Sequence, residues 1–212
     1  MRRTLPLLLC CALMGGCAYR DSSSAITIPI ITAPPPVGTS LAWREVASPG
    51  DIDRIASLAD RYGAALGSKG PQNLRVDARK GWPDPTPGVY DCRITRLAVG
   101  QAVVRATPFK PFLCYVGDDD HFLTMTKSTG TERPGGRLWR DDGQRMVFLG
   151  AVPAAGNTTP SAYGDDAATD RIGIFERIGE FHWRLIFDAP RPGIAFDVLE
   201  MTPLPRPVVA AR

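Results

Sequence analysis

The chain has 212 residues, of which 22% are charged and 44% are hydrophobic. This length suits one domain with a core of its own, and the composition is that of an ordinary globular protein. The 25 Lys and Arg residues are nearly balanced by 22 Asp and Glu residues, and like charges form no block. Nucleic-acid binding needs a concentrated basic surface, so we expect no nucleic-acid partner.

The N-terminus has the three-part layout of a secretion signal. A short basic start is followed by an apolar run at 5–14 and by two glycines directly before Cys17. This run is shorter than the roughly 20 residues that a membrane-spanning helix needs. Small residues before a cysteine resemble the lipobox of bacterial lipoproteins, in which the cysteine becomes an acylated N-terminus. We expect residues 1–16 to be the signal peptide and Cys17 to be lipidated; an ordinary signal peptide with a chance cysteine is the alternative.

A lipidated cysteine predicts export and a membrane anchor on the periplasmic side of the bacterial envelope. Position 18 is Ala rather than the Asp that retains lipoproteins at the inner membrane, and this favours the outer membrane. Residues 17–40 mix Ser, Thr and Pro and are expected to form a tether, although the strand-like run Ile26–Ile31 offers docking onto a sheet edge as the alternative. Residues 41–204 then form a single β-rich domain, with a C-terminal tail at 205–212.

One amphipathic helix is expected near the start of the domain. Ser48 suits its N-cap, Pro49 its first position and Asp51 its first turn. Apolar residues then recur at helical spacing up to Gly67: Ile52, Ile55, Leu58, Tyr62 and Leu66. The pattern predicts a helix over 49–66 whose apolar face lies on the rest of the domain.

After a proline-rich joint at 81–88 the apolar period changes to two, which indicates β-strands. Two hairpins are predicted, one around Asp142-Gly143 and one around Gly179-Glu180. The series of short strands is "VYDCRI", "QAVVRA", "PFLCYV", "HFLTMTK", "GRLWR", "QRMVFLGA", "RIGIFERI", "FHWRLIF" and "AFDVLEM". We therefore predict a mainly β fold: an antiparallel meander of seven to nine strands in a closed or nearly closed barrel, which the helix plugs or flanks. A β-sandwich is the alternative.

Cysteine usage adds one covalent expectation. Removal of the signal peptide and lipidation of Cys17 leave Cys92 and Cys114 as a pair in an oxidising compartment. Both share strand parity with apolar neighbours and should point into the core. We expect a disulfide between them; two buried thiols that never pair are the alternative.

The strand segments together resemble a family of exported bacterial proteins, domain-of-unknown-function family 4893. The resemblance runs from Trp43 to Pro203, and its distinctive elements are Tyr90, Cys92, Arg93, Cys114, Phe148, Leu149, Gly150, Glu176, Arg177, Ile178, Trp183, Arg184 and Leu185. The segment "TGTERPGG" departs from the family pattern but keeps Arg133. The resemblance supports the cysteine pair and implies no activity.

Candidate binding residues are arginines in or beside the strands: Arg93, Arg133, Arg145, Arg177 and Arg184, with Glu176. Gathered on one sheet face or inside the barrel, they would bind an anionic group. Structural ion pairs on the outer surface are the alternative.

The sequence indicates no catalytic residue, metal site or cofactor. His121 follows three aspartates in "GDDDH", but consecutive Asp residues in a turn point in different directions and are typical of a solvated loop. We expect a binding or interaction module that takes a small anionic ligand in its barrel mouth or contacts an envelope protein. An envelope enzyme, hydrolase-like and using Asp, Glu and Arg residues, is the alternative.

Overall fold

The computed structural model describes residues 42–67, 70–99, 104–119, 122–141, 143–191 and 193–204. The predicted signal peptide, the tether with Cys17 and the run Ile26–Ile31, and the tail at 205–212 lie outside these residues. No helix among the described residues is long and apolar enough to cross a membrane.

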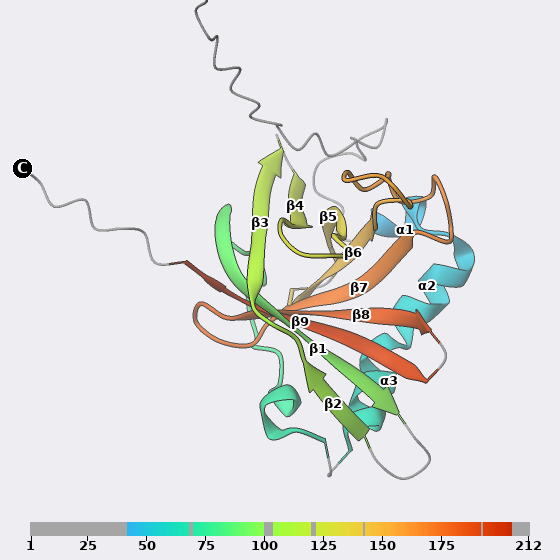
Figure 1. Cartoon of the computed structure of the whole chain (residues 1–212). Helices are drawn as coiled ribbons and strands as arrows, with labels where there is room; N and C mark the ends of the chain where they lie inside the picture. The colour runs from blue at the N-terminus through green and yellow to red at the C-terminus, as the bar shows by residue number, and fades with distance from the viewer. Residues whose placement is uncertain are drawn as a thin grey trace, which may run out of the picture.

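In the described part of the chain, nine antiparallel strands form one closed barrel with an extension, which confirms the predicted fold and rules out the sandwich (Figure 1). Eight strands close the barrel because β1 pairs with β9, and β2 pairs only with the far half of β1. Their bounds are β1 Gly88–Val99, β2 Val104–Pro108, β3 Phe112–Asp119, β4 Phe122–Lys127, β5 Gly135–Arg140, β6 Arg145–Ala151, β7 Asp170–Arg177, β8 Trp183–Arg191 and β9 Ile194–Pro203. Both predicted hairpins, β5–β6 and β7–β8, are present.

The interior of the barrel is a packed hydrophobic core. The rings of Phe148 and Phe187 meet edge to face there, with centroids 5.4 Å apart. Both ends of this core are covered. At one end Trp183 Nε1 donates to the carbonyl of Pro83 at 2.9 Å, and at the other the ammonium of Lys127 lies 4.6 Å from the centre of the Phe112 ring. The interior of the barrel is therefore filled by its own side chains.

Strands β5 and β6 approach unusually closely at a pair of glycines. Gly136 pairs directly with Gly150, and a Cβ on either would collide with the other's backbone. A Cβ on Gly150 would also meet the Phe148 ring, so side chains are excluded here by both strand spacing and core packing. This explains physically why the Phe148-Leu149-Gly150 element ends in glycine.

The predicted disulfide joins Cys92 of β1 to Cys114 of β3, with Cα atoms 6.0 Å apart. The two strands are direct neighbours, and the connection between them contains β2. The bridge runs diagonally, since Cys92 is opposite Phe112 and Cys114 is opposite Tyr90. It lies inside the barrel core, as strand parity predicts. A loop of this size is expected to stabilise the fold by roughly 3 kcal/mol through the entropy of the unfolded chain.

The predicted helix is present but is interrupted. It consists of α2 (Pro49–Ala56) and α3 (Leu58–Leu66), preceded by the short α1 (Trp43–Val46) and followed by the 3₁₀ turn η1 (Gln72–Arg75). The prediction of one continuous helix over 49–66 was wrong at Ser57. Its hydroxyl donates to the carbonyls of Asp53 and Arg54, and such bonds to the preceding turn bend helices.

The helices flank the barrel rather than plugging it (Figure 1). Helix α3 packs Leu58 and Leu66 against outward-facing residues such as Ile174, Ile186 and Val198, while α1 and α2 cover the outer face of β5–β7. The outer wall under the helices is therefore a second apolar layer.

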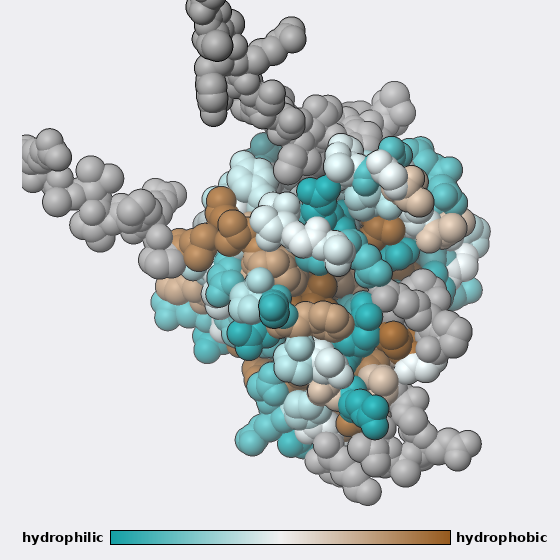
Figure 2. Space-filling model, viewed as in Figure 1, coloured by the Kyte–Doolittle hydropathy of each residue, from teal (hydrophilic) through white to brown (hydrophobic). Residues whose placement is uncertain are grey.

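The opposite side of the barrel has no helix over it. Large apolar side chains are exposed on β1, β3 and just beyond β9, namely Val89, Leu113, Tyr115 and Leu204. On the face shown in Figure 2, brown and teal residues intermingle rather than forming a single apolar sheet.

Candidate functional site: a cleft between helix and barrel

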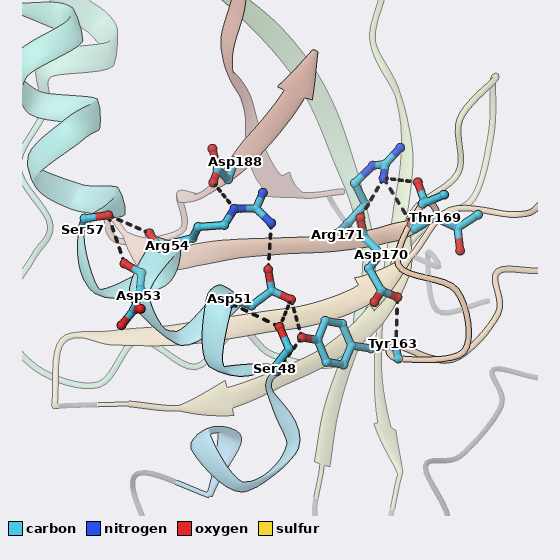
Figure 3. Close-up of polar contacts among 12 residues, drawn as sticks. Ser48, Asp51, Asp53, Arg54, Ser57, Tyr163, Thr169, Asp170, Arg171 and Asp188 are labelled. Carbon is cyan, nitrogen blue, oxygen red and sulfur yellow. Dashed lines mark hydrogen bonds and ion pairs between the residues drawn. The ribbon is translucent and has the colours of Figure 1, made fainter. Parts of the chain in front are cut away.

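The position of the helices is fixed by charged contacts to strand β8. Asp188 is buried in the wall and accepts from Arg54 Nε at 2.9 Å and from Arg61 Nη2 at 3.0 Å. Figure 3 shows Arg54 bridging Asp188 on one side and Asp51 on the other. Because the two arginines come from α2 and α3, one carboxylate holds both helical segments in register with the sheet.

The long loop between β6 and β7 holds the start of α2. Tyr163 of this loop donates its hydroxyl proton to Asp51 Oδ2 at 2.6 Å and accepts from the backbone N–H of Ser48 at 3.0 Å (Figure 3). Burial raises the pKa of Tyr163, so the phenol stays protonated and can donate. These two hydrogen bonds therefore attach the N-terminus of α2 to the β6–β7 loop.

A cleft opens where α3 ends. Gly67, with φ of 45°, terminates the helix, and the chain then runs back through η1 and residues 76–78. The volume enclosed between α3, this returning segment and the outer wall of β7 and β8 is about 340 Å³. Its apolar walls include Leu66, Val76 and Ile186.

A buried ion pair forms the polar floor of the cleft. Arg184 of β8 and Glu176 of β7 are direct cross-strand partners, and Nη2 and Nε of the arginine donate to the same oxygen, Oε2, at 2.7 and 3.0 Å. Nη1 of the arginine donates to the carbonyl of Leu74 at 3.1 Å. The pair thus connects the barrel wall to the returning segment and leaves Oε1 of Glu176 outside the ion pair.

Tyr62 of α3 completes the floor. Its hydroxyl donates to the same Leu74 carbonyl at 2.7 Å, and the Arg184 guanidinium lies 5.2 Å from its ring centre. Burial raises the pKa of Tyr62 to about 12, which keeps the phenol protonated at any physiological pH.

Gly63 keeps the helix side of the cleft open. It lines the cleft, and a Cβ placed on it would have no atom within 4 Å. A glycine inside a helix is about 1 kcal/mol less favourable than alanine. A side chain at this position would meet no steric obstacle, so packing does not require a glycine. The effect of Gly63 is to leave room in the cleft beside Tyr62.

The structure does not gather the five predicted arginines into one site. Arg184 lies in the cleft with Glu176, both on the outer wall rather than inside the barrel. Strand register places Arg145 and Arg184 on either side of Glu176, and Arg184 and Arg93 on either side of Glu200, so these residues form one row on the outer face of the barrel. Within this row Arg145 also pairs with Asp141 at 2.8 Å, and Arg93 is exposed. The other two predicted arginines lie outside the row: Arg133 is in the β4–β5 connection, and Arg177 is at the end of β7.

Sequence reasoning missed most of the residues that line the cleft. Tyr62 was assigned to the core alone, and Gly63 and Arg75 were not singled out. A glycine in the middle of an otherwise regular amphipathic helix was the one available signal.

The histidines and aspartates form no metal site in the described part of the chain, where no group of three or more potential ligands is found. His182 Nε2 lies 3.4 Å from Glu200 on the barrel surface, and His121 is outside the described residues.

The fold and cleft define a small closed β-barrel carrying a helical segment on its outer wall. Residues 43–201 match the model of the domain of unknown function DUF4893, so the chain belongs to this family. No curated protein and no solved structure matches the chain.

Glu176→Gln should lower the free energy of unfolding by about 3 kcal/mol, because it leaves the buried Arg184 charge without its counter-charge. The double variant Glu176→Leu, Arg184→Met should be less destabilised than Glu176→Gln. Urea denaturation measures both. A loss below 1 kcal/mol for Glu176→Gln would contradict the role given to the pair.

Proposed function

We propose that this protein is a lipid-anchored binding module of the bacterial envelope that holds a small ligand in the cleft between α3 and the barrel. The observation that carries the proposal is the cleft itself, about 340 Å³ with apolar walls and a buried Arg184–Glu176 pair on its floor. Small-molecule sites usually enclose about 300–1,000 Å³ and combine apolar walls with a few fixed polar groups.

The lining favours an amphipathic ligand with an anionic group. Leu66, Val76 and Ile186 offer apolar contact to its body. The charged residues that line the cleft are Arg75, Asp77, Glu176 and Arg184, and Arg184 is already paired with Glu176. Arg75 is therefore the residue that we propose contacts the anionic group, since guanidinium groups bind carboxylates and phosphates through paired N–H donors. We therefore propose that the anion site lies on the outer wall rather than in the barrel, whose interior is filled by side chains.

Binding is favoured over catalysis by the state of the ionisable groups. Acid–base catalysis needs a group that changes protonation near the working pH. Tyr62, which lines the cleft, remains protonated because burial raises its pKa to about 12. A hydrolase-like envelope enzyme remains the alternative proposal, and an envelope protein is the alternative ligand.

The anchor rests on the N-terminal sequence. The basic start, the apolar run and the two glycines before Cys17 support export and acylation of that cysteine. Ala18 supports the outer membrane as the destination. Acyl chains anchor proteins through burial of methylene groups, each contributing about 0.8 kcal/mol.

Gly63→Leu should fill the cleft and abolish binding of small anions with an apolar body. The probes are a panel of alkyl and aryl carboxylates. Their binding is measured by NMR titration, from the chemical shifts of the backbone amides of α3 and β8. We expect panel members to shift these resonances in the wild type and to bind Gly63→Leu at least tenfold more weakly.

Gly50→Leu is the matched control, since Gly50 is also helical and also has open space around its Cβ position. It lies outside the cleft and should bind as the wild type does. Equal affinity of the wild type and Gly63→Leu, or no carboxylate that shifts the cleft resonances, would refute the proposed site.

Mass spectrometry of the N-terminal peptide from protein isolated from membranes should show Cys17 as the first residue, carrying acyl chains. Cys17→Ser should release the protein from the membrane fraction. An unmodified cysteine, or cleavage at another position, would contradict lipid anchoring.

A further inference from the structure

Three buried polar groups lie without partners on the outer surface of β4 and β5. They are Thr126 Oγ1, Arg137 Nη1 and Trp139 Nε1, and none has a hydrogen-bond partner among the described residues. Each of these three residues is only 4% exposed. An unpaired buried donor is destabilising by about 1–3 kcal/mol, so three on one surface call for an acceptor-rich neighbour.

Strand register places these groups together. Thr124 is opposite Arg137 and Thr126 is opposite Gly135, and the intervening Met125 points into the barrel. Thr126 and Arg137 therefore face outward on adjacent strands, with Trp139 two residues further along β5.

The same surface is aromatic. The Arg137 guanidinium lies 4.2 Å from the ring centre of Phe122 and 5.8 Å from that of Trp139. The two rings are neighbours, with centroids 5.9 Å apart. We refer to Phe122, Thr126, Arg137 and Trp139 as the β4–β5 surface. It combines flat apolar rings with N–H donors, the combination that binds polyproline-type chains.

The described chain begins beside this surface. Trp43 donates through Nε1 to Asp141 Oδ1 at 2.9 Å, directly beyond the end of β5, and it packs in one cluster with Trp139. Ala42 is buried in the same cluster. The preceding residues, 33–41, read "APPPVGTSL". The tether therefore joins the domain next to the unpaired donors.

We propose that the proline-rich end of the tether, residues 33–41, docks on the β4–β5 surface as an extended polyproline-type chain. Such a chain has free carbonyls and few N–H groups, and it matches a surface that offers donors. Pro36 is six residues from Ala42, a reach of about 19 Å at 3.1 Å per residue. The five residues of β5 from Trp139 to Gly135 span only about 13 Å.

The consequence concerns how the domain is held. If residues 33–41 are docked, the linker between Cys17 and the domain is limited to residues 18–32. The position of the cleft relative to the point where the tether leaves the barrel is then fixed. This docking is independent of the ligand proposed above.

A double-mutant cycle on residues 18–212, the chain that follows the lipidated cysteine, tests the docking. One change replaces Pro34, Pro35 and Pro36 by Ala; the other is Arg137→Met, which keeps the stem against the rings and removes the donors. The proline change should lower the unfolding midpoint by about 3 °C in the wild type and by much less in Arg137→Met. Replacing Pro205 and Pro207 by Ala, in the C-terminal tail, is the matched control and should leave the midpoint unchanged.

Hydrogen exchange of the backbone amides at 37–41 gives a second readout. They should be protected in the wild type and lose at least tenfold of that protection in Arg137→Met. No midpoint shift in the wild type, an equal shift in both backgrounds, or unprotected amides at 37–41 would overturn the proposal.

Discussion

The outer wall of strands β7 to β9 is apolar and must be covered, and much of the structure depends on this constraint. Ile174, Ile186 and Val198 point away from a barrel that is already filled on its inside. Each fully buried aliphatic side chain contributes roughly 1.5–3 kcal/mol relative to exposure. Leu58 of α3, with no exposed surface, packs on this wall and joins the two layers of the domain.

Polar contacts determine the position of the helices that cover this wall. Apolar packing is non-directional, so it does not by itself select one position for a helix on a smooth wall. Asp188 does so by accepting from Arg54 and Arg61, and Tyr163 does so at the helix start through Asp51. The cleft exists because the helices cover the wall only in part. Helix α3 ends at Gly67, and the segment that runs back through η1 and residues 76–78 leaves a gap over the Glu176–Arg184 pair.

The barrel was predictable because its signal is local. Period-two segments separated by turns indicated the strands, and the parity of Cys92 and Cys114 placed both inside. The β8 sequence, however, indicated a strand with one buried face, whereas Ile186 and Arg184 on its other face are buried as well. That burial depends on a helix more than 100 residues earlier in the chain, which no local period reveals.

The cleft was not predictable for the same reason. Its floor joins Leu74 to Arg184, which are 110 residues apart, and the ion pair requires the exact pairing of β7 with β8. The sequence indicated Arg184 and Glu176 as candidates together with Arg93 and Arg145, which lie in the same outer row, but also with Arg133 and Arg177, which lie outside it. Register and helix placement are tertiary properties, and they decide which charges meet.

The central claim is that α3 is docked on the apolar barrel wall and thereby forms the cleft. Urea denaturation of Leu58→Asp tests it most directly, because this change puts an unpaired charge into that contact. The account predicts a loss of about 3 kcal/mol or more in the free energy of unfolding. An unfolding midpoint equal to that of the wild type would contradict the docking of α3, and with it the cleft.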